Sequence, residues 1–143
     1  MNLYGYDTTG YIGILDPQRH LVRARYVSAE GHPAGMVDAL RRIWATTASG
    51  DTTRLITTVL AHDWDRLDPT ITPITQSGRP DRLPVTGVGI ALTDDEPEPP
   101  CAFPLSQARL LDVDWIYLLD PCADTVTIHT DDGDPVGVHP LAM

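Results

Sequence analysis

Histidines and carboxylates stand close together at two points of the chain, and such pairs are the usual carriers of proton transfer in enzymes. Glu30 and His32 are separated by one glycine, and His62 is followed directly by Asp63. Imidazole and carboxylate groups also bind divalent metal ions. One hypothesis is therefore a small metal-dependent or histidine/acid hydrolase that uses these four residues.

Each pair also has a structural interpretation, which the sequence favours. No Gly-x-Ser-x-Gly motif accompanies Glu30 and His32, so His32 is expected to cap or pack at a strand-to-helix turn. His62 follows a segment with helical periodicity, where an imidazole suits the negative end of the helix dipole.

A third group of metal-ligand residue types lies near the C-terminus. It lacks the spacing of a calcium loop, because Gly133 precedes Asp134 and no glutamate closes the segment. Asp and Gly are also favoured turn residues. We interpret the segment as an acidic turn with outward histidines, and we expect no metal and no cofactor. The residues concerned are His129, Asp131, Asp132, Asp134 and His139.

The charge of the chain is unevenly distributed. The formal net charge is −10, yet residues 1–66 carry seven acids and seven arginines, and residues 67–143 carry thirteen acids and three arginines. An acidic surface of this kind, in residues 67–143, repels nucleic acid phosphates and favours basic protein partners, although acidity also serves solubility. The predicted partner-binding residues are Asp94, Asp95, Glu96, Glu98, Asp131, Asp132 and Asp134.

Residue usage excludes several classes of site and limits the cellular setting. The chain has no lysine, which excludes a Schiff-base or P-loop lysine. No apolar run approaches the length of a membrane span, and no secretory signal is recognisable. We expect a cytoplasmic protein with no membrane contact. Cys101 and Cys122 are expected as free thiols, and their pairing is left open.

The elements that must position these residues follow from periodicity. Residues 11–15 and 21–27 alternate as a β-hairpin. A helix is expected from Pro33 to Ser49-Gly50, and Asp51 is a good N-cap for a second one. Residues 66–84 read as loop. Further predicted elements are a strand at 85–92, a helical turn at 106–111 and a strand at 114–120.

The last predicted element is a hairpin with a three-residue loop, Asp131-Asp132-Gly133, in which Gly133 is left-handed. This loop pairs Val126 with Val138 and Ile128 with Val136, so that all four face the core. The predicted fold is a single α+β domain over residues 1–143, in the order strand, strand, helix, helix and three strands. Two helices cover one face of an antiparallel sheet of about five to six strands.

The segment Tyr26–Gly35 resembles a motif in small actinobacterial and actinophage proteins that have no established activity. Their pattern runs Tyr, aliphatic, two residues, acid, Gly, x, Pro, x, Gly, and a later Trp-x-Tyr strand corresponds here to residues 115–117. Here Ser28, Ala29, Glu30 and His32 replace the usual His, aromatic, Asp and Tyr. The resemblance implies a phage or mobile-element setting.

Taken together, these patterns favour a small acidic non-enzymatic protein that docks on a host or defence protein with a basic surface. A second alternative to the hydrolase is a structural subunit of a homo-oligomer or virion-associated assembly.

Overall fold

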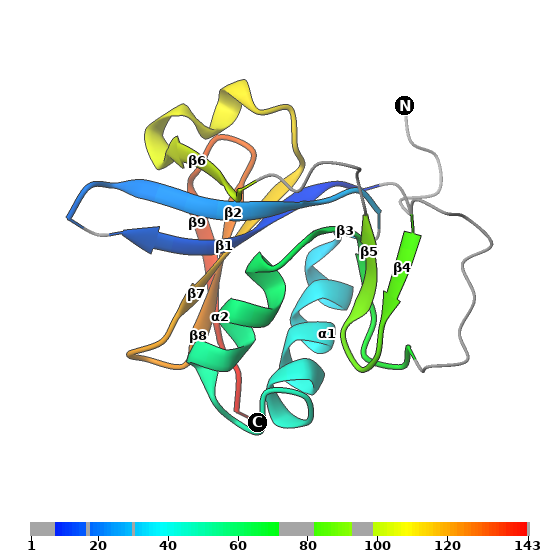
Figure 1. The fold of residues 1–143 in the computed structure, drawn as a ribbon. Helices are drawn as coiled ribbons and strands as arrows, with labels where there is room; N and C mark the ends of the chain where they lie inside the picture. Colours follow the sequence, from blue (N-terminus) through cyan, green and yellow to red (C-terminus); the bar gives the residue numbers. More distant parts are fainter. Residues whose placement is uncertain (1–7, 17, 30, 72–81, 93–98, 143) are drawn as a thin grey trace.

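The computed structural model describes residues 8–16, 18–29, 31–71, 82–92 and 99–142. Over these residues the chain forms nine strands in one sheet, two α-helices and one 3-10 helix (Figure 1). In chain order they are β1 (Gly10–Asp16), β2 (Leu21–Val27), α1 (Pro33–Ala45), α2 (Thr52–Leu60), β3 (Asp63–Leu67), β4 (Arg82–Val85), β5 (Gly89–Leu92), β6 (Cys101–Pro104), η1 (Leu105–Leu110), β7 (Trp115–Asp120), β8 (Thr125–Thr130) and β9 (Pro135–Pro140).

The sheet is mixed, which corrects the predicted fold class. Its strands lie in the order β4-β5-β3-β2-β1-β7-β8-β9, and β6 pairs with β2 outside this path. The pairs β1–β7 and β2–β3 are parallel and the others are antiparallel. The expected antiparallel sheet of five to six strands is therefore wrong, since the described residues alone form nine strands.

Two features of the chain explain the difference. The helices α1 and α2 connect β2 to its neighbour β3, and a connection of this kind returns the chain to the same end of the sheet, which makes the two strands parallel. β4 and β6 contain Pro84 and Pro104, and proline weakens a strand pattern although edge positions tolerate it. The predicted strand 85–92 is divided by a turn at residues 86–88.

The turn between β2 and α1 is held by backbone contacts at Gly31. Its N–H donates to the Thr8 carbonyl (2.8 Å), and the buried Tyr117 hydroxyl donates to its carbonyl. A Cβ at this position would lie 2.9 Å from the Thr8 oxygen. Gly31 is thus required by the close approach of another segment. His32 caps α1 through Nδ1, which accepts from the Ala34 N–H (3.4 Å), as the sequence predicts.

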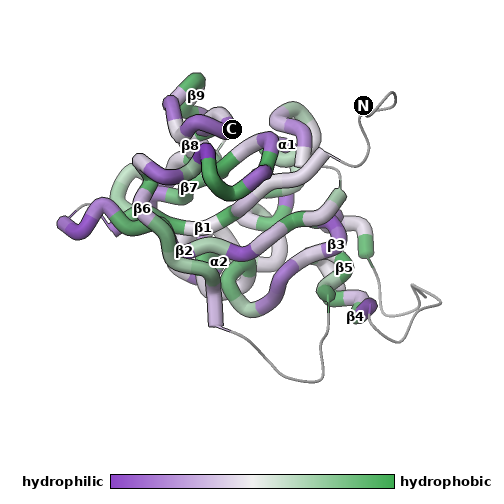
Figure 2. Tube along the Cα trace, turned by 90° about the horizontal axis from the view of Figure 1, so that it is seen from above, coloured by the Kyte–Doolittle hydropathy of each residue, from purple (hydrophilic) through white to green (hydrophobic). Residues whose placement is uncertain are grey.

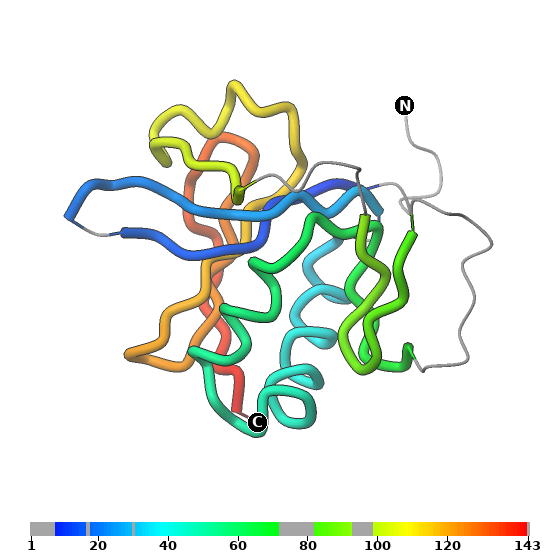
Figure 3. Tube along the Cα trace, viewed as in Figure 1, coloured from blue at the N-terminus to red at the C-terminus, as the bar shows by residue number. Residues whose placement is uncertain are grey.

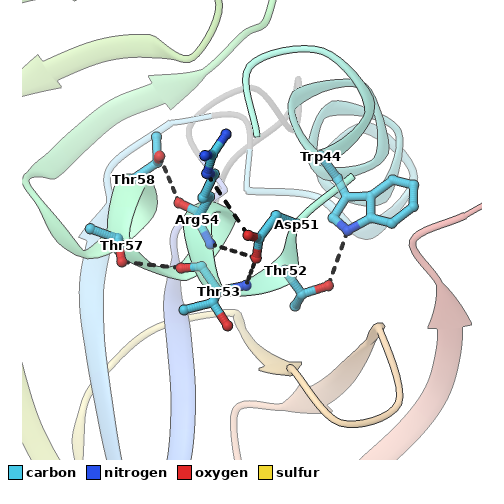
Figure 4. A network of polar contacts seen from close by, with 7 residues as sticks. All are labelled: Trp44, Asp51, Thr52, Thr53, Arg54, Thr57 and Thr58. Atoms are coloured by element: carbon cyan, nitrogen blue, oxygen red, sulfur yellow. Dashed lines mark hydrogen bonds and ion pairs between the residues drawn. The ribbon is translucent and has the colours of Figure 1, made fainter. Parts of the chain in front are cut away.

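The N-cap predicted for the second helix is confirmed (Figure 4). The Asp51 carboxylate accepts hydrogen bonds from the N–H groups of Thr53 (2.9 Å) and Arg54 (3.3 Å), and the Arg54 guanidinium lies 3.8 Å from it. The Trp44 indole N–H donates to the Thr52 hydroxyl (3.0 Å) and ties α1 to the start of α2.

Each face of the sheet carries its own apolar cluster. The larger one fills the space between the sheet and the two helices and includes Ile12, Leu40, Leu55, Trp64 and Tyr117. The smaller one lies on the opposite face, where β6, η1 and the residues that follow cross the sheet (Figure 3). Its buried members are Val22, Ala24, Phe103, Ala108, Val113, Ile116 and Leu118.

The β8–β9 hairpin has the predicted loop but a different register. Gly133 has φ +86° and its N–H donates to Thr130 (2.9 Å), as expected of the three-residue loop. A bulge then shifts the ladder, so that Ile128 pairs with Gly137 and Thr127 with Val138. The prediction that Val136 and Val138 face the core is therefore wrong, and both are more than half exposed (58% and 61%).

Candidate functional site

The β8–β9 hairpin joins exposed acids to exposed apolar side chains. We call Asp131, Asp132, Asp134, Val136 and Val138 the hairpin surface, and all five are exposed. β9 is an outer strand of the sheet and combines hydrophobic with hydrophilic residues (Figure 2). Among the described residues, no arginine or histidine forms an ion pair with these three carboxylates.

The backbone of this hairpin is fixed by contacts with neighbouring elements. Gly133 packs against η1, where an added Cβ would lie 2.7 Å from the Leu105 carbonyl oxygen. The ring Nδ1 of His129, a buried residue, is 3.0 Å from the Gly133 carbonyl oxygen. The expectation of outward histidines is thus wrong for His129. The hairpin surface is therefore packed against η1 on one side and held to β8 on the other.

An apolar cleft of about 340 Å³ adjoins the hairpin surface on the face opposite the helices. Leu15, Leu118 and Thr127 line it, with Asp120 at its rim. Thr127 pairs with Val138 across the strands, so the cleft and the exposed valines belong to one continuous stretch of the sheet.

Several predicted site residues fall outside the described part of the chain. They are Glu30, from the histidine/acid alternative, and the four acids Asp94, Asp95, Glu96 and Glu98. The predictions that involve them stay predictions.

The remaining residues of the histidine/acid alternative each have a structural partner of their own. The exposed His32 caps α1, and the His62 ring meets the Trp64 ring edge-on, with centroids 5.6 Å apart. Asp63 accepts a hydrogen bond from the Tyr26 N–H (3.1 Å) and lies 3.8 Å from the Arg25 guanidinium. Within the described ranges, no three His, Cys, Asp or Glu side chains are placed to hold a metal ion.

Asp63 marks a fork in the sheet that the sequence did not reveal. One edge of β2 pairs with β6 from Leu21 to Ala24 and with β3 at Val27. Between these two partners the Tyr26 N–H is satisfied by the Asp63 carboxylate, which takes the place of a strand carbonyl. The two strands β3 and β6 therefore leave a gap along β2.

A cleft of about 600 Å³ occupies this gap, and we call it the fork cleft. Its lining residues come from four separate segments and combine aromatic, acidic, thiol and proline side chains. Tyr11 and Tyr26 face each other across β1 and β2, with ring centroids 5.8 Å apart in an edge-on arrangement. The lining residues are Tyr11, Tyr26, Asp63, Pro99, Pro100 and Cys101.

The tyrosines of the fork cleft are held in their neutral form. Burial, with a smaller contribution from contact with the Cys101 thiol and from Asp63, raises the pKa of Tyr11 to about 12. Burial also raises the pKa of Tyr26, and Asp114 and Asp112 act in the same direction. Both phenols therefore keep their protons at neutral pH.

Comparison with protein-family models, with curated proteins and with solved structures found no match for this chain. The resemblance to actinobacterial and actinophage proteins stays a prediction. None of the described helices has both the length and the apolarity to cross a membrane. Cys101 and Cys122 are free and exposed.

The fork cleft was missed because its residues are far apart in sequence. The hairpin predicted for residues 11–15 and 21–27 places Tyr11 near Tyr26, so strand alternation was a signal for this pair of rings. Cys101 joins them only through β6, whose Cys-Ala-Phe-Pro sequence has no alternating pattern of useful length.

Proposed function

We propose that the chain is a small acidic, non-enzymatic binding protein that docks its hairpin surface on a protein partner with a basic surface. The observation that carries the proposal is the combination of two exposed valines with three exposed aspartates on one hairpin. Exposed apolar side chains next to charge are typical of interaction surfaces, whereas acidity alone serves solubility.

The chemistry of the hairpin favours side-chain docking over the addition of a partner strand. Pro135 and Pro140 stand at the two ends of β9, and Gly137 with its neighbouring bulge interrupts the strand between them. Proline and bulges are common devices that prevent edge-to-edge pairing. The partner would then contact the valines and the adjoining apolar cleft, while its basic groups approach the loop acids.

The resemblance of Tyr26–Gly35 to the actinobacterial and actinophage motif supports a phage or mobile-element setting, and a host or defence protein is the partner class that we propose. Electrostatic attraction of this kind acts mainly on the rate of encounter.

The test uses charge-matched variants. Partner capture is compared between the wild type, Asp131→Asn/Asp132→Asn and Thr53→Arg/Thr57→Arg, which changes the charge equally on exposed positions of α2. We expect that only the hairpin variant loses binding to the partner, and that this binding is saturable and weakened by salt. Equal loss in both variants, or in neither, would contradict docking through this surface.

The apolar half of the surface has its own matched control. Val136→Ser/Val138→Ser is compared with Leu83→Ser, an exposed leucine on the opposite outer strand β4. The valine variant is expected to release the partner faster. Light scattering of the free protein tests the alternative of a homo-oligomer. A defined oligomer that dissociates in the valine variant would support that alternative.

A further inference from the structure

The fork cleft lies at a different place from the hairpin surface, and its chemistry points to a small ligand. The cleft is bounded by β1, β2, the start of β3 and the start of β6, whereas the hairpin surface lies on β9 and its loop. A volume of about 600 Å³ suits a small organic group, since ligand pockets measure roughly 300–1,000 Å³.

The carboxylate in the cleft has one oxygen left for a ligand. The Tyr26 N–H and the Arg25 guanidinium both contact Oδ1 of Asp63. Its Oδ2 has no hydrogen-bond partner among the described residues, and the Asp63 side chain is 39% exposed. An oxygen of this kind accepts hydrogen bonds from an ammonium or guanidinium group.

None of the described residues that line the cleft carries a positive charge. The Arg25 guanidinium lies 3.8 Å from Asp63 Oδ1, but Arg25 alternates away from Tyr26 along β2 and is 9% exposed. Its Nε donates to the Leu60 carbonyl (2.8 Å) at the end of α2, where a cation is favoured by the helix dipole. The charge of Arg25 is thus directed to the helix side.

Anions are disfavoured in the cleft for the same reason. Asp63 lies close enough to Tyr11, and Asp112 and Asp114 to Tyr26, to contribute to the raised pKa of each phenol, and these carboxylates disfavour an anion beside the rings. The two neutral phenol rings add the negative potential of their faces, and such rings attract organic cations. Pro99 and Pro100 supply apolar walls that fit alkyl groups.

From this geometry we propose that the fork cleft binds an organic cation, an alkylammonium or guanidinium group, between the tyrosine rings and Asp63. The group is either a free small amine or the side chain of a peptide, and the two sources share the same chemistry. No bond is made or broken, and Cys101 stands at the mouth of the cleft as an exposed thiol.

The first test compares a cation with a neutral molecule of the same shape. Choline, its carbon isostere dimethylbutanol, and methylguanidinium are titrated into the intact protein, and the tyrosine NMR signals are followed. We expect saturable shifts at Tyr11 and Tyr26 with the two cations, and binding of the isostere weaker by about tenfold. Equal responses to choline and its isostere would overturn the proposal.

A second measurement needs no variant and carries an internal control. Cys101 lines the fork cleft, whereas Cys122 lies in the β7–β8 turn, and both are exposed. Choline at saturation should slow maleimide modification of Cys101 and leave the rate at Cys122 unchanged. Equal rates at Cys101 with and without choline would count against the proposal.

Variants then assign the contacts. Asp63→Asn should weaken cation binding about tenfold through the lost charge. Tyr11→Phe keeps the ring and should bind choline almost as well as the wild type. Cation affinity unchanged by Asp63→Asn would overturn the role of the carboxylate, and a thermal melt of each variant shows that it is folded.

A capped Arg-containing tripeptide distinguishes the two sources. Tighter binding of the peptide than of methylguanidinium would assign the site to a partner's side chain, because contacts beyond the guanidinium then contribute. Binding of methylguanidinium without binding of the peptide would assign it to a free small molecule. Binding of neither cation would overturn the proposal.

Discussion

The two faces of the sheet are covered to different degrees, and both clefts lie on the less covered face. The helices close one face over a cluster that includes Trp64 and Tyr117, whose polar atoms donate to backbone carbonyls inside the protein. On the other face, β6 and η1 cover only part of the sheet, and the fork cleft and the apolar cleft lie beside that cover. The helix side therefore holds the larger buried cluster, and the open side holds the clefts on which the two proposals rest.

The largest loss of stability is expected at Gly31, in the turn between β2 and α1. Gly31→Val places a side chain against the backbone of Thr8 and Thr9, where even a Cβ would lie 2.9 and 3.1 Å from their atoms. Overpacking of this kind costs about 1–3 kcal/mol. Denaturant unfolding should show this loss for Gly31→Val.

Neighbouring positions in the same turn supply the controls. His32→Ala removes a long capping bond and should cost about 0.5–1 kcal/mol, less than Gly31→Val. Gly35 has open space around it within α1, so Gly35→Ala should stabilise the protein by about 0.5–1 kcal/mol. A greater loss from His32→Ala than from Gly31→Val would show that the turn depends on the histidine.

A smaller difference in stability is expected between substitutions of Tyr117 and Tyr11, which lie on opposite faces of the sheet. Tyr117→Phe removes the hydroxyl that satisfies the buried Gly31 carbonyl and should cost about 1–2 kcal/mol. Tyr11→Phe keeps the ring against Tyr26 and Phe103 and should cost less, about 0.5 kcal/mol. Equal losses in thermal melts would remove the distinction between the faces.

Alkaline pH should weaken the fold through the same tyrosines. The usual pKa of tyrosine is about 10, and burial raises the pKa of Tyr11 to about 12. The unfolded chain therefore releases this proton first, and the stability that Tyr11 contributes is complete below about pH 10 and is lost as the pH rises through about 12.

Denaturant unfolding at a series of alkaline pH values measures this loss. The decline between about pH 10 and pH 12 should be less steep in Tyr11→Phe than in the wild type. Identical slopes would mean that Tyr11 titrates freely in the folded protein.

The smallest change in stability is expected on the hairpin surface. Asp131→Arg/Asp132→Arg alters exposed loop residues and should shift the free energy of unfolding by no more than about 0.5 kcal/mol. The same variant should slow association with the basic partner, because exposed charges act on encounter. Unchanged association at low salt would leave solubility as the role of these acids.

Local patterns were sufficient for part of the fold and failed where distant segments meet. Asp51, Pro33 and Gly133 have strong short-range preferences, so both helix starts and the last loop were predictable. The register of β9 was not, because a bulge shifts the pairing between Ile128 and His129 and leaves Val136 exposed, and strand alternation alone does not indicate a bulge.

The candidate site divides in the same way. Composition identified the acids of the hairpin surface, although alternation placed the neighbouring valines in the core. β3 was missed because its sequence, Asp-Trp-Asp-Arg-Leu, contains three charged residues in five. Without β3 and β6 the fork cannot be inferred, and Asp63 could be assigned only to its neighbour His62.

The fork also divides the molecule into two parts that should open at different free energies. β6 contacts the rest of the sheet through four residue pairs with β2, and η1 follows it directly. Their detachment uncovers the smaller cluster and leaves β3, the helices and the larger cluster in place. Sub-global opening of this kind has a lower free energy than global unfolding. The amide proton of Phe103, which faces β2, should therefore exchange with solvent before those of Val27 and Trp64. The segment that covers the open side of the sheet should detach at a lower free energy than global unfolding requires.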